Sequence, residues 1–458
     1  MSRFDLIIAG GAVVRSITPS PGTPGEGWGG GVVQADIAIT DGKIVEVAPS
    51  IAGSARERIE AGNLVVFPGL IDSHVHFNQP GRTDWEGIAT GSSALAAGGG
   101  TCFFDMPLNS SPPVLDGAAF DAKKRAAERS SVTDFGLWGG LTPINLDRME
   151  ELAARGVVGF KAFMCPSGID DFPYADLKTL EHGMRTASKL GLPVAVHAEN
   201  PQLLEESRAK ATGKSWADYL NSRPVLCEAQ AVGMACACAK LTGCSLHVVH
   251  VSSPLVLDII AWERAHGTDV TCETCPHYFL LHDEDVPRIG ARAKCAPPLR
   301  SSEESRLLAA RLREQIDFVA SDHSPAPPSM KTGDDAFAIW GGIAGVQSTL
   351  ASLLSFENAS ALTRTRIAAL IAGNAARRYK ITHKAKIEVG FDADLTLVDP
   401  DTKYTLTREM LLDRHKLSPY VGRTFRGVIH RTIVRGTTVF QNGKIVSPPI
   451  GRLVKPQR

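Results

Sequence analysis

The sequence has no excess of charge of either sign. Its 458 residues include 49 Lys and Arg against 49 Asp and Glu, so the formal net charge at pH 7 is zero. A protein that binds nucleic acid needs a basic surface to neutralise phosphates, and this balance argues against such a partner. The chain is otherwise ordinary for a globular protein, 43% hydrophobic and 21% charged, and long enough for one large domain and a smaller one.

The start of the chain has no long apolar run. The opening stretch MSRFDLIIAGGAVV is too short to cross a bilayer, and it lacks the cleavage-site pattern of a signal peptide. Nine cysteines, an odd number, favour reduced thiols over a disulfide framework. Cys272 and Cys275 have CxxC spacing, but no second pair follows at zinc-finger distance. We therefore expect a cytoplasmic protein that binds neither membranes nor nucleic acid.

Eight short apolar segments, rich in β-branched residues, recur along the middle of the chain. They are 64–77, 99–107, 133–140, 156–164, 191–200, 244–253, 268–277 and 315–325. Helical patterns lie between them, for example at 116–130, 176–190 and 228–241. Strands that alternate with helices predict right-handed βαβ units and a parallel sheet. Eight such units predict an α/β fold of the (β/α)₈ TIM-barrel type.

Two local patterns add detail to this barrel. Thr83 to Glu86 has the spacing of a capping box, which predicts the start of the first helix. The basic residues of 121–130 predict a solvated helix face.

The two ends of the chain have a different pattern, of short strands joined by Gly-rich turns. Asn442-Gly443 is a typical hairpin signal. Neither end alone looks able to bury a core, so we expect residues 1–64 and 385–458 to form one small composite β-sandwich domain beside a barrel of residues 65–384. The Pro/Gly-rich stretch 16–31 predicts a flexible excursion of that domain.

Polar side chains end the predicted strands, where barrel enzymes carry their chemistry. Residues i and i+2 of a strand point to the same side, so His74 and His76 converge on one spot. The fourth, fifth, sixth and eighth strands end in Lys161, His197, His250 and Asp322. A single histidine at a strand end is more often a packing residue, but six such groups at one rim favour a shared site. Neutral imidazoles and carboxylates are good ligands for zinc and similar divalent ions.

Lys161 is the exception in this set, because a protonated amine has no lone pair and repels a cation. Burial within GVVGFKAFM would lower its pKa and leave the amine free to react with carbon dioxide. The product is a carbamate, which is chemically a carboxylate on a long arm. The alternative is that Lys161 caps a strand end or pairs with an acid.

These motifs resemble the cyclic amidohydrolases, the group of dihydroorotases, hydantoinases and allantoinases in the amidohydrolase superfamily. The motifs follow the family order, with HVH at 74–76, GFKAF at 159–163, HAEN at 197–200, HVSS at 250–253 and SDHSP at 321–325. The resemblance implies a two-metal centre of zinc, or of cobalt, iron or manganese. The implied ligands are His74, His76, Lys161 as N6-carboxylysine, His197, His250 and Asp322. His247 would lie behind them. A homotetramer and a small cyclic ureide substrate are also implied.

Departures from the dihydroorotase pattern narrow the range of substrates that we expect. Asn78 replaces the arginine of the HVHFRE-type motif, and Ala296 replaces the asparagine of NPPLR. Both changes remove groups that bind a substrate carboxylate, which disfavours dihydroorotate. The stretches HVHFNQPGRTDWEG, ETCPHYF and WGGIAGVQSTL resemble allantoinases more closely than hydantoinases. A hydantoinase would also carry a tyrosine close to the carbamylated lysine, where this chain has Phe160, Phe163 and Met164.

The resemblance therefore implies hydrolysis of the ring amide of allantoin to allantoate by a hydroxide that bridges the metals. Asp322 would act as base and then as acid. The expected substrate contacts are Asn78, Cys165, Ser324, Gly341 and Gly342. A hydantoinase or dihydropyrimidinase-type ring hydrolase, and a non-catalytic scaffold of the same fold, remain alternatives.

Overall fold

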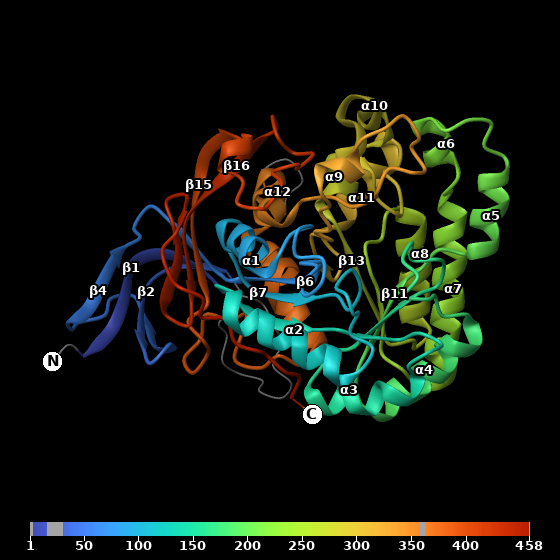
Figure 1. Ribbon diagram of the computed structural model, residues 1–458. Coiled ribbons are helices and arrows are strands. Elements are labelled where there is room, and N and C mark those ends of the chain that lie inside the picture. The colour runs from blue at the N-terminus through green and yellow to red at the C-terminus, as the bar shows by residue number, and fades with distance from the viewer. Residues whose placement is uncertain (1–2, 16–30, 358–361, 458) are drawn as a thin grey trace.

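The computed structural model describes residues 3–15, 31–357 and 362–457. The predicted flexible excursion, 16–31, lies outside the described residues except for Gly31. Figure 1 shows a large α/β part, in which helices surround the central strands, and a β-sheet packed against one side of it.

The central strands are parallel and fall into two sheets, of orders β6-β7-β8 and β14-β13-β12-β11-β10-β9. Their bounds are β6 Leu70–Val75, β7 Gly100–Asp105, β8 Asp134–Leu137, β9 Gly139–Gly140, β10 Phe160–Phe163, β11 Val194–His197, β12 Leu246–Val248, β13 Val270–Thr274 and β14 Phe318–Val319. Each of the eight predicted segments contains at least one of them, and the third contains both β8 and β9.

The first and last central strands meet beyond the end of β14. Val75 and His323 form a parallel bridge, and the His76 N–H donates to the His323 carbonyl at 2.8 Å. The α/β architecture with parallel strands is confirmed. The paired strands of the described chain are divided between two sheets, and no unbroken ring of strand pairing is present among them.

Helices cover the outer side of these strands, which explains why most of their residues are buried. The α-helices are α1 Ile88–Ala97, α2 Gly117–Ser130, α3 Met149–Arg155, α4 Leu177–Lys189, α5 Pro201–Ala209, α6 Trp216–Asn221, α7 Val225–Thr242, α8 Pro254–Ala265, α9 Pro276–Leu280, α10 Val286–Ile289, α11 Ser302–Arg311, α12 Thr349–Phe356, α13 Arg364–Ala368 and α14 Asn374–Arg378. The three predicted helical patterns are α2, α4 and α7. Asp116 and Asp176 cap α2 and α4, each accepting a hydrogen bond from a first-turn N–H at 2.8 Å.

The predicted capping box at Thr83 to Glu86 is wrong. Helix α1 begins after Gly87, and no side chain caps it. Glu86 is instead fully buried, 3.4 Å from His323 Nε2 and 3.2 Å from the backbone N–H of Arg414. A buried carboxylate needs such partners, and these tertiary contacts override the local capping preference.

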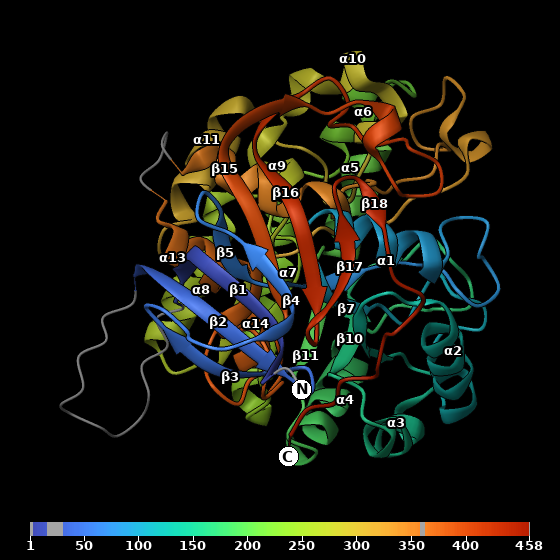
Figure 2. The same cartoon turned by 90° about the vertical axis from the view of Figure 1, so that its left-hand side faces the viewer.

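Strands from both chain ends join in one nine-stranded mixed sheet (Figure 2), of order β18-β17-β16-β15-β5-β1-β2-β3 with β4 beside β1. The strands are β1 Phe4–Val14, β2 Val32–Thr40, β3 Lys43–Ala48, β4 Ala55–Glu60, β5 Val65–Pro68, β15 Leu395–Thr405, β16 Thr424–Val434, β17 Thr437–Gln441 and β18 Lys444–Ile445. The two ends thus fold together as expected, although their strands pair as a single sheet. Asn442 and Gly443 form the predicted hairpin turn between β17 and β18, both with positive φ.

The apolar run 64–77 forms two strands instead of one. β5 pairs with β1 and β15 in the end sheet, whereas β6 belongs to the central strands. The division falls at Gly69, where a Cβ atom would lie 2.2 Å from the Thr101 side chain. Only glycine allows this close approach.

A buried ion cluster joins the end sheet to the central strands. Lys384 Nζ lies 2.7 Å from Asp134, at the start of β8, and 2.5 and 3.1 Å from Asp394 and Asp392 before β15. Three carboxylates around one buried amine fix the relative position of the two parts.

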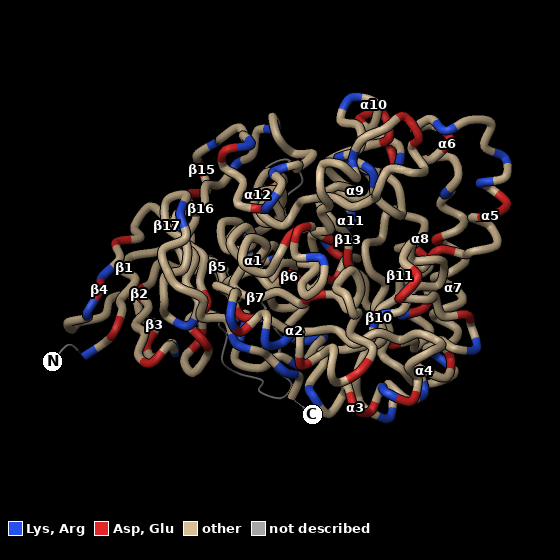
Figure 3. Tube along the Cα trace, viewed as in Figure 1, with Lys and Arg blue, Asp and Glu red and all other residues tan. Residues whose placement is uncertain are grey.

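Three general expectations from composition can be compared with the fold. Basic and acidic residues are interspersed along the trace (Figure 3). All nine cysteines are free thiols, as predicted. By length and composition, one stretch, Trp216–Thr242, is apolar enough to cross a bilayer, and 44% of its 18-residue apolar window is buried inside the fold.

Candidate metal centre and its cavity

Five of the six predicted ligands line one cavity of about 950 Å³ at the C-terminal ends of the central strands. They are His74, His76, His197, His250 and Asp322. The sixth, Lys161, lies in β10 and is fully buried. Segments far apart in the sequence therefore bring their predicted metal-binding groups to one place.

His74, His76 and Asp322 form the first half of the centre. Asp322 Oδ1 lies 3.3 Å from His74 Nε2 and 3.4 Å from His76 Nε2. One ligand atom from each residue lies within 4.8 Å of the others, which is close enough for a shared ion. Behind them, the His74 Nδ1–H donates to Glu273 at 2.6 Å. That hydrogen bond leaves the lone pair of Nε2 facing the cavity.

His197 and His250 form the second half. His197 Nδ1 and His250 Nε2 are 3.0 Å apart, and His197 Nε2–H donates to Glu199 at 2.7 Å. Arg223 in turn donates to Glu199. A carboxylate thus orients one histidine in each half, an arrangement typical of metal-binding imidazoles.

Lys161 lies close enough to His74, His197 and His250 to interact with them electrostatically. Its Nζ lies 5.2 Å from the centroid of the Phe163 ring, which stacks on His197 at 4.5 Å. Among the described residues, Nζ has no hydrogen-bond partner. Burial lowers the pKa of Lys161 from 10.5 to about 8. An unpaired, buried amine is unusual, because such groups normally have a partner.

The protonation states of the other groups suit cation binding. Burial lowers the pKa of His74, His197 and His250, so these rings are neutral and carry a free lone pair. Burial by itself would raise the pKa of Asp322, but His74 and His76 hold it at about 2. The site therefore presents neutral nitrogen atoms and a charged carboxylate.

Two of the predicted ligands have strained backbones. His250 has a φ of 41° and Asp322 a φ of 44°, in the left-handed region that β-branched and most other residues avoid. Such conformations cost about 1–3 kcal/mol and are held only where the surrounding structure requires them. Here they direct both side chains into the cavity.

Three of the five predicted substrate contacts line the cavity, namely Ser324, Gly341 and Gly342. Asn78 and Cys165 are buried and are not part of its wall. The Asn78 amide donates to the Pro325 carbonyl at 3.4 Å, next to Ser324. Both residues lie behind the cavity surface, where they support it.

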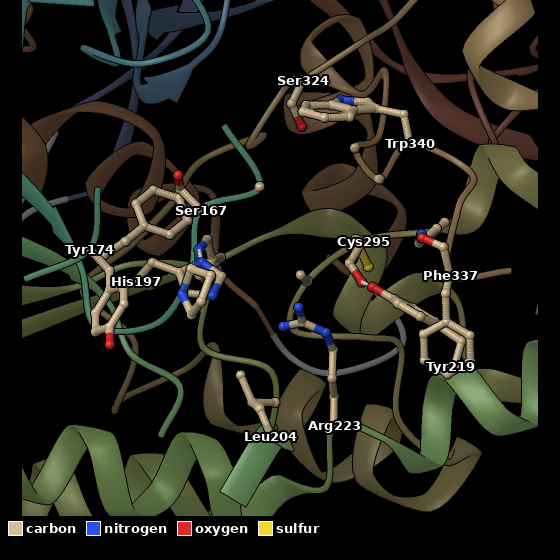
Figure 4. A pocket seen from close by; sticks show the side chains of 18 of the residues that line it. Ser167, Tyr174, His197, Leu204, Tyr219, Arg223, Cys295, Ser324, Phe337 and Trp340 are labelled. Atoms are coloured by element: carbon tan, nitrogen blue, oxygen red, sulfur yellow. Dashed lines mark hydrogen bonds between the residues drawn. The ribbon is translucent and has the colours of Figure 1, made fainter. Parts of the chain in front are cut away.

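Figure 4 shows the remaining walls of the cavity. Tyr174 and Ser167 lie on the side of His197, whereas Phe337 and Tyr219 lie on the opposite side. The Arg223 side chain rises between the two sides. The cavity is therefore lined by aromatic as well as polar groups.

Sequence reasoning did not identify Glu273 and Glu199. Glu273 lies within the CxxC stretch, between two cysteines, and its Oε2 is 2.8 Å from Ser73 Oγ and 3.2 Å from His247 Nε2. His247 thus contacts the same carboxylate as His74. A signal was available for both acids, because an acid inside an apolar strand, or two residues from a strand-end histidine, needs a buried partner.

Comparisons with known proteins agree on one family. The sequence profile of the amidohydrolase family matches residues 65–439. The chain is 52% identical to the allantoinase of Rubrobacter xylanophilus over 463 residues, covering 100% of this chain and 99% of the relative. It is 40% identical to the allantoinase of Escherichia coli, covering 99% and 100%. The solved L-hydantoinase (dihydropyrimidinase) of Arthrobacter aurescens matches the fold with a TM-score of 0.93 at 31% identity, covering 99% and 100%.

Proposed function

The chain belongs to the amidohydrolase family, and we propose that it hydrolyses the ring amide of allantoin to give allantoate. The observation that carries this proposal is the full-length similarity, at 40–52% identity, to relatives named allantoinase. The cavity supports it, because its imidazoles and carboxylate are the groups that metal-dependent hydrolysis of an amide requires.

The donor set fits two divalent ions. His74, His76 and Asp322 offer ligand atoms within 4.8 Å of one another, and His197 Nδ1 lies 3.0 Å from His250 Nε2. The unpaired amine of Lys161 can become a carbamate and supply a further anionic group. The proposed ligands are His74, His76, Lys161 as N6-carboxylysine, His197, His250 and Asp322. A pair of bound ions supplies an activated water and polarises the ring carbonyl. Zinc, cobalt, iron and manganese all suit these ligands.

The chain's own residues then orient the substrate and move the proton. Asp322 Oδ1 faces the two histidines, which leaves Oδ2 to accept a proton from the attacking water. The same atom returns that proton to the departing ring nitrogen. Glu273 and Glu199 keep their histidines in one orientation throughout.

Ring specificity follows from what the cavity wall offers. Ala296 lines the cavity where a dihydroorotase motif has asparagine, whereas Asn78, in place of its arginine, is buried behind the wall. At these two positions the chain therefore lacks the side chains by which a dihydroorotase motif binds a substrate carboxylate. Ser324, Gly341 and Gly342 remain to bind the ring.

A hydantoinase-type ring hydrolase is the second candidate. The specific observation in its favour is the high structural similarity to solved proteins named hydantoinase. The lower sequence identity of those proteins, 27–31%, ranks this candidate below allantoin hydrolysis.

Three further features belong to this proposal. We interpret the two central sheets as one (β/α)₈ barrel of residues 65–384, joined by the contact between Val75 and His323. The end segments 1–64 and 385–458 are its companion domain. We also propose a homotetramer in the cytoplasm, where free thiols such as these nine persist.

A parallel substrate assay tests the proposal. Protein loaded with metal and bicarbonate is offered allantoin, hydantoin and dihydroorotate under identical conditions. Release of allantoate, with little turnover of the other two, is the expected result. Faster hydrolysis of hydantoin would select the second candidate, and no hydrolysis of any ring would favour a non-catalytic scaffold.

A further inference from the structure

One wall of the cavity is the loop of residues 337–342, and all six of its residues line the cavity. Most of its backbone groups are engaged elsewhere. Asp335 accepts hydrogen bonds from the N–H groups of residues 337–339, Met330 accepts from Trp340, and Lys294 O accepts from Gly342 at 2.8 Å. The loop is therefore held from behind on its N–H side.

Two lysine side chains hold the carbonyl side of the same loop. Lys331 Nζ donates to the carbonyl groups of Trp340 at 3.0 Å and Gly342 at 2.6 Å. Lys294 Nζ donates to the carbonyl groups of Phe337 at 3.1 Å and of Ile339. Four of the six carbonyl groups of the loop thus accept from these two amines.

Gly341 differs from its neighbours in the loop. Within the described chain, it is the loop residue whose N–H and C=O both lack a protein partner. The carbonyl groups of Trp340 and Gly342 on either side are both taken by Lys331. A donor and an acceptor therefore remain free at one residue of the cavity wall, and they complement the N–H and C=O of a cyclic amide.

Gly342, the next residue, has a conformation and a close contact that leave no room for a side chain. A Cβ atom on Gly342 would lie 2.1 Å from the Ser324 carbonyl oxygen, and its φ of 116° is one that other residues rarely adopt. Ser324 N–H donates to the Ile343 carbonyl at 3.0 Å, so the loop is also tied to the segment that carries Asp322. The free groups of Gly341 thus stand at a set distance from the metal centre.

We propose that Lys294 and Lys331 are positioning residues for substrate recognition: they hold the 337–342 loop so that the N–H and C=O of Gly341 are presented to the ring amide. The inference rests on the proposed function, because it takes a cyclic amide as the ligand. Neither lysine takes part in the chemistry.

The energetics favour a role beyond general stability. Burial and the neighbouring Lys294 lower the pKa of Lys331 to about 7, and burial and Arg223 lower that of Lys294 to about 8. Placing two amines this close inside a fold is costly, and apolar side chains of similar size could fill the same space at lower cost. Amines are needed here because they donate to carbonyl groups that would otherwise be unpaired.

The test compares three lysine-to-methionine variants of the metal-loaded enzyme. Lys331→Met and Lys294→Met each remove two donors to the loop carbonyls. Lys214→Met is the matched control, because Lys214 is exposed and pairs with Asp335, at the base of the same loop, at 2.8 Å. Steady-state kinetics with allantoin, metal content and circular dichroism are measured for each.

We expect the KM for allantoin to rise about tenfold in Lys331→Met and Lys294→Met, the scale of one well-placed hydrogen bond, with kcat changed by less than about threefold. Metal content should stay at the wild-type level. Lys214→Met should match the wild type throughout. Lys294→Arg keeps donors at the loop and should recover most of the lost affinity.

The outcomes separate the inference from the proposed function. A wild-type enzyme that does not open allantoin overturns the proposed function itself. If the wild type is active and both Lys331→Met and Lys294→Met keep the wild-type KM, the inference is overturned. A fall in kcat at unchanged KM in these variants also overturns the inference, because it indicates that a smaller fraction of the variant protein is folded. If Lys331→Met does not fold, the Met and Arg variants of Lys294 decide, since Lys294 holds the other two carbonyl groups.

Discussion

Glu273 is the acid on which three side chains of the metal centre converge, and changing it to glutamine perturbs them without changing the volume. Oε1 accepts from His74 Nδ1 at 2.6 Å, and Oε2 lies 2.8 Å from Ser73 Oγ and 3.2 Å from His247 Nε2. Glutamine offers one acceptor oxygen and one NH₂ group. In Glu273→Gln, the NH₂ group of the new side chain therefore faces a hydrogen-bond donor of His74, or of Ser73 and His247.

The size of the effect follows from these contacts. Losing the carboxylate behind a metal-binding imidazole typically lowers metal affinity about 10- to 100-fold, or roughly 1.4 to 2.7 kcal/mol. An unpaired buried donor costs about 1–3 kcal/mol in the free energy of unfolding as well. Because His74 is a proposed ligand and Glu273 is fully buried, we expect both losses.

The assay is a competition between the protein and a chromophoric chelator at buffered free metal, with the melting temperature measured in parallel. Glu228→Gln is the matched control. Glu228 is also buried, but it pairs with Ser252 and Arg300, which are not proposed ligands. The control should lose stability and keep its metal affinity. Wild-type metal affinity in Glu273→Gln would refute the role assigned to this carboxylate.

Three further predictions concern the cavity wall and the contact between the two parts of the fold. Gly342→Ala should abolish most activity because its Cβ would lie 2.1 Å from Ser324, whereas Gly233→Ala, in helix α7 with nothing within 4 Å of the added atom, should remain active in the same assay. Cys165→Ala should leave the KM for allantoin unchanged, because the thiol is buried behind the wall. Burial alone would lower the pKa of Lys384, but the surrounding carboxylates raise it well above 10.5. The stabilisation that the ion pairs of Lys384 give the fold is therefore present below about pH 10.5 and is lost as the pH rises through the raised pKa. Lys384→Met should therefore cost about 3–5 kcal/mol in urea unfolding at pH 7, with a gap to the wild type that narrows in strongly alkaline buffer.

The strands and the proposed ligands could be predicted because their signals are local. β7 and β11, for example, are largely apolar, and the polar residue at the end of each marks the rim of the fold. His74 lies in β6 and His76 follows directly after its end, with the two ring centroids 5.4 Å apart, so the i, i+2 spacing places both rings on one side. The cavity contains them for this reason.

What the sequence could not provide were contacts between distant segments. Lys123 belongs to a run predicted as a solvated helix face, yet it is fully buried, 3.1 Å from Asp105, and donates to the Met106 carbonyl at 2.6 Å. Glu86 matched a capping box but pairs with His323, more than two hundred residues away. Local preferences cannot indicate such partners, because burial of a charge is decided by the whole fold.

The central claim is that two metal ions are held by histidines, Asp322 and a carbamate on Lys161. Metal content per chain, measured on wild type and Lys161→Ala purified side by side in bicarbonate, tests it most directly. We predict two ions in the wild type, and loss of both ions together with turnover in the variant. A variant that keeps the wild-type metal content and full activity would contradict the account.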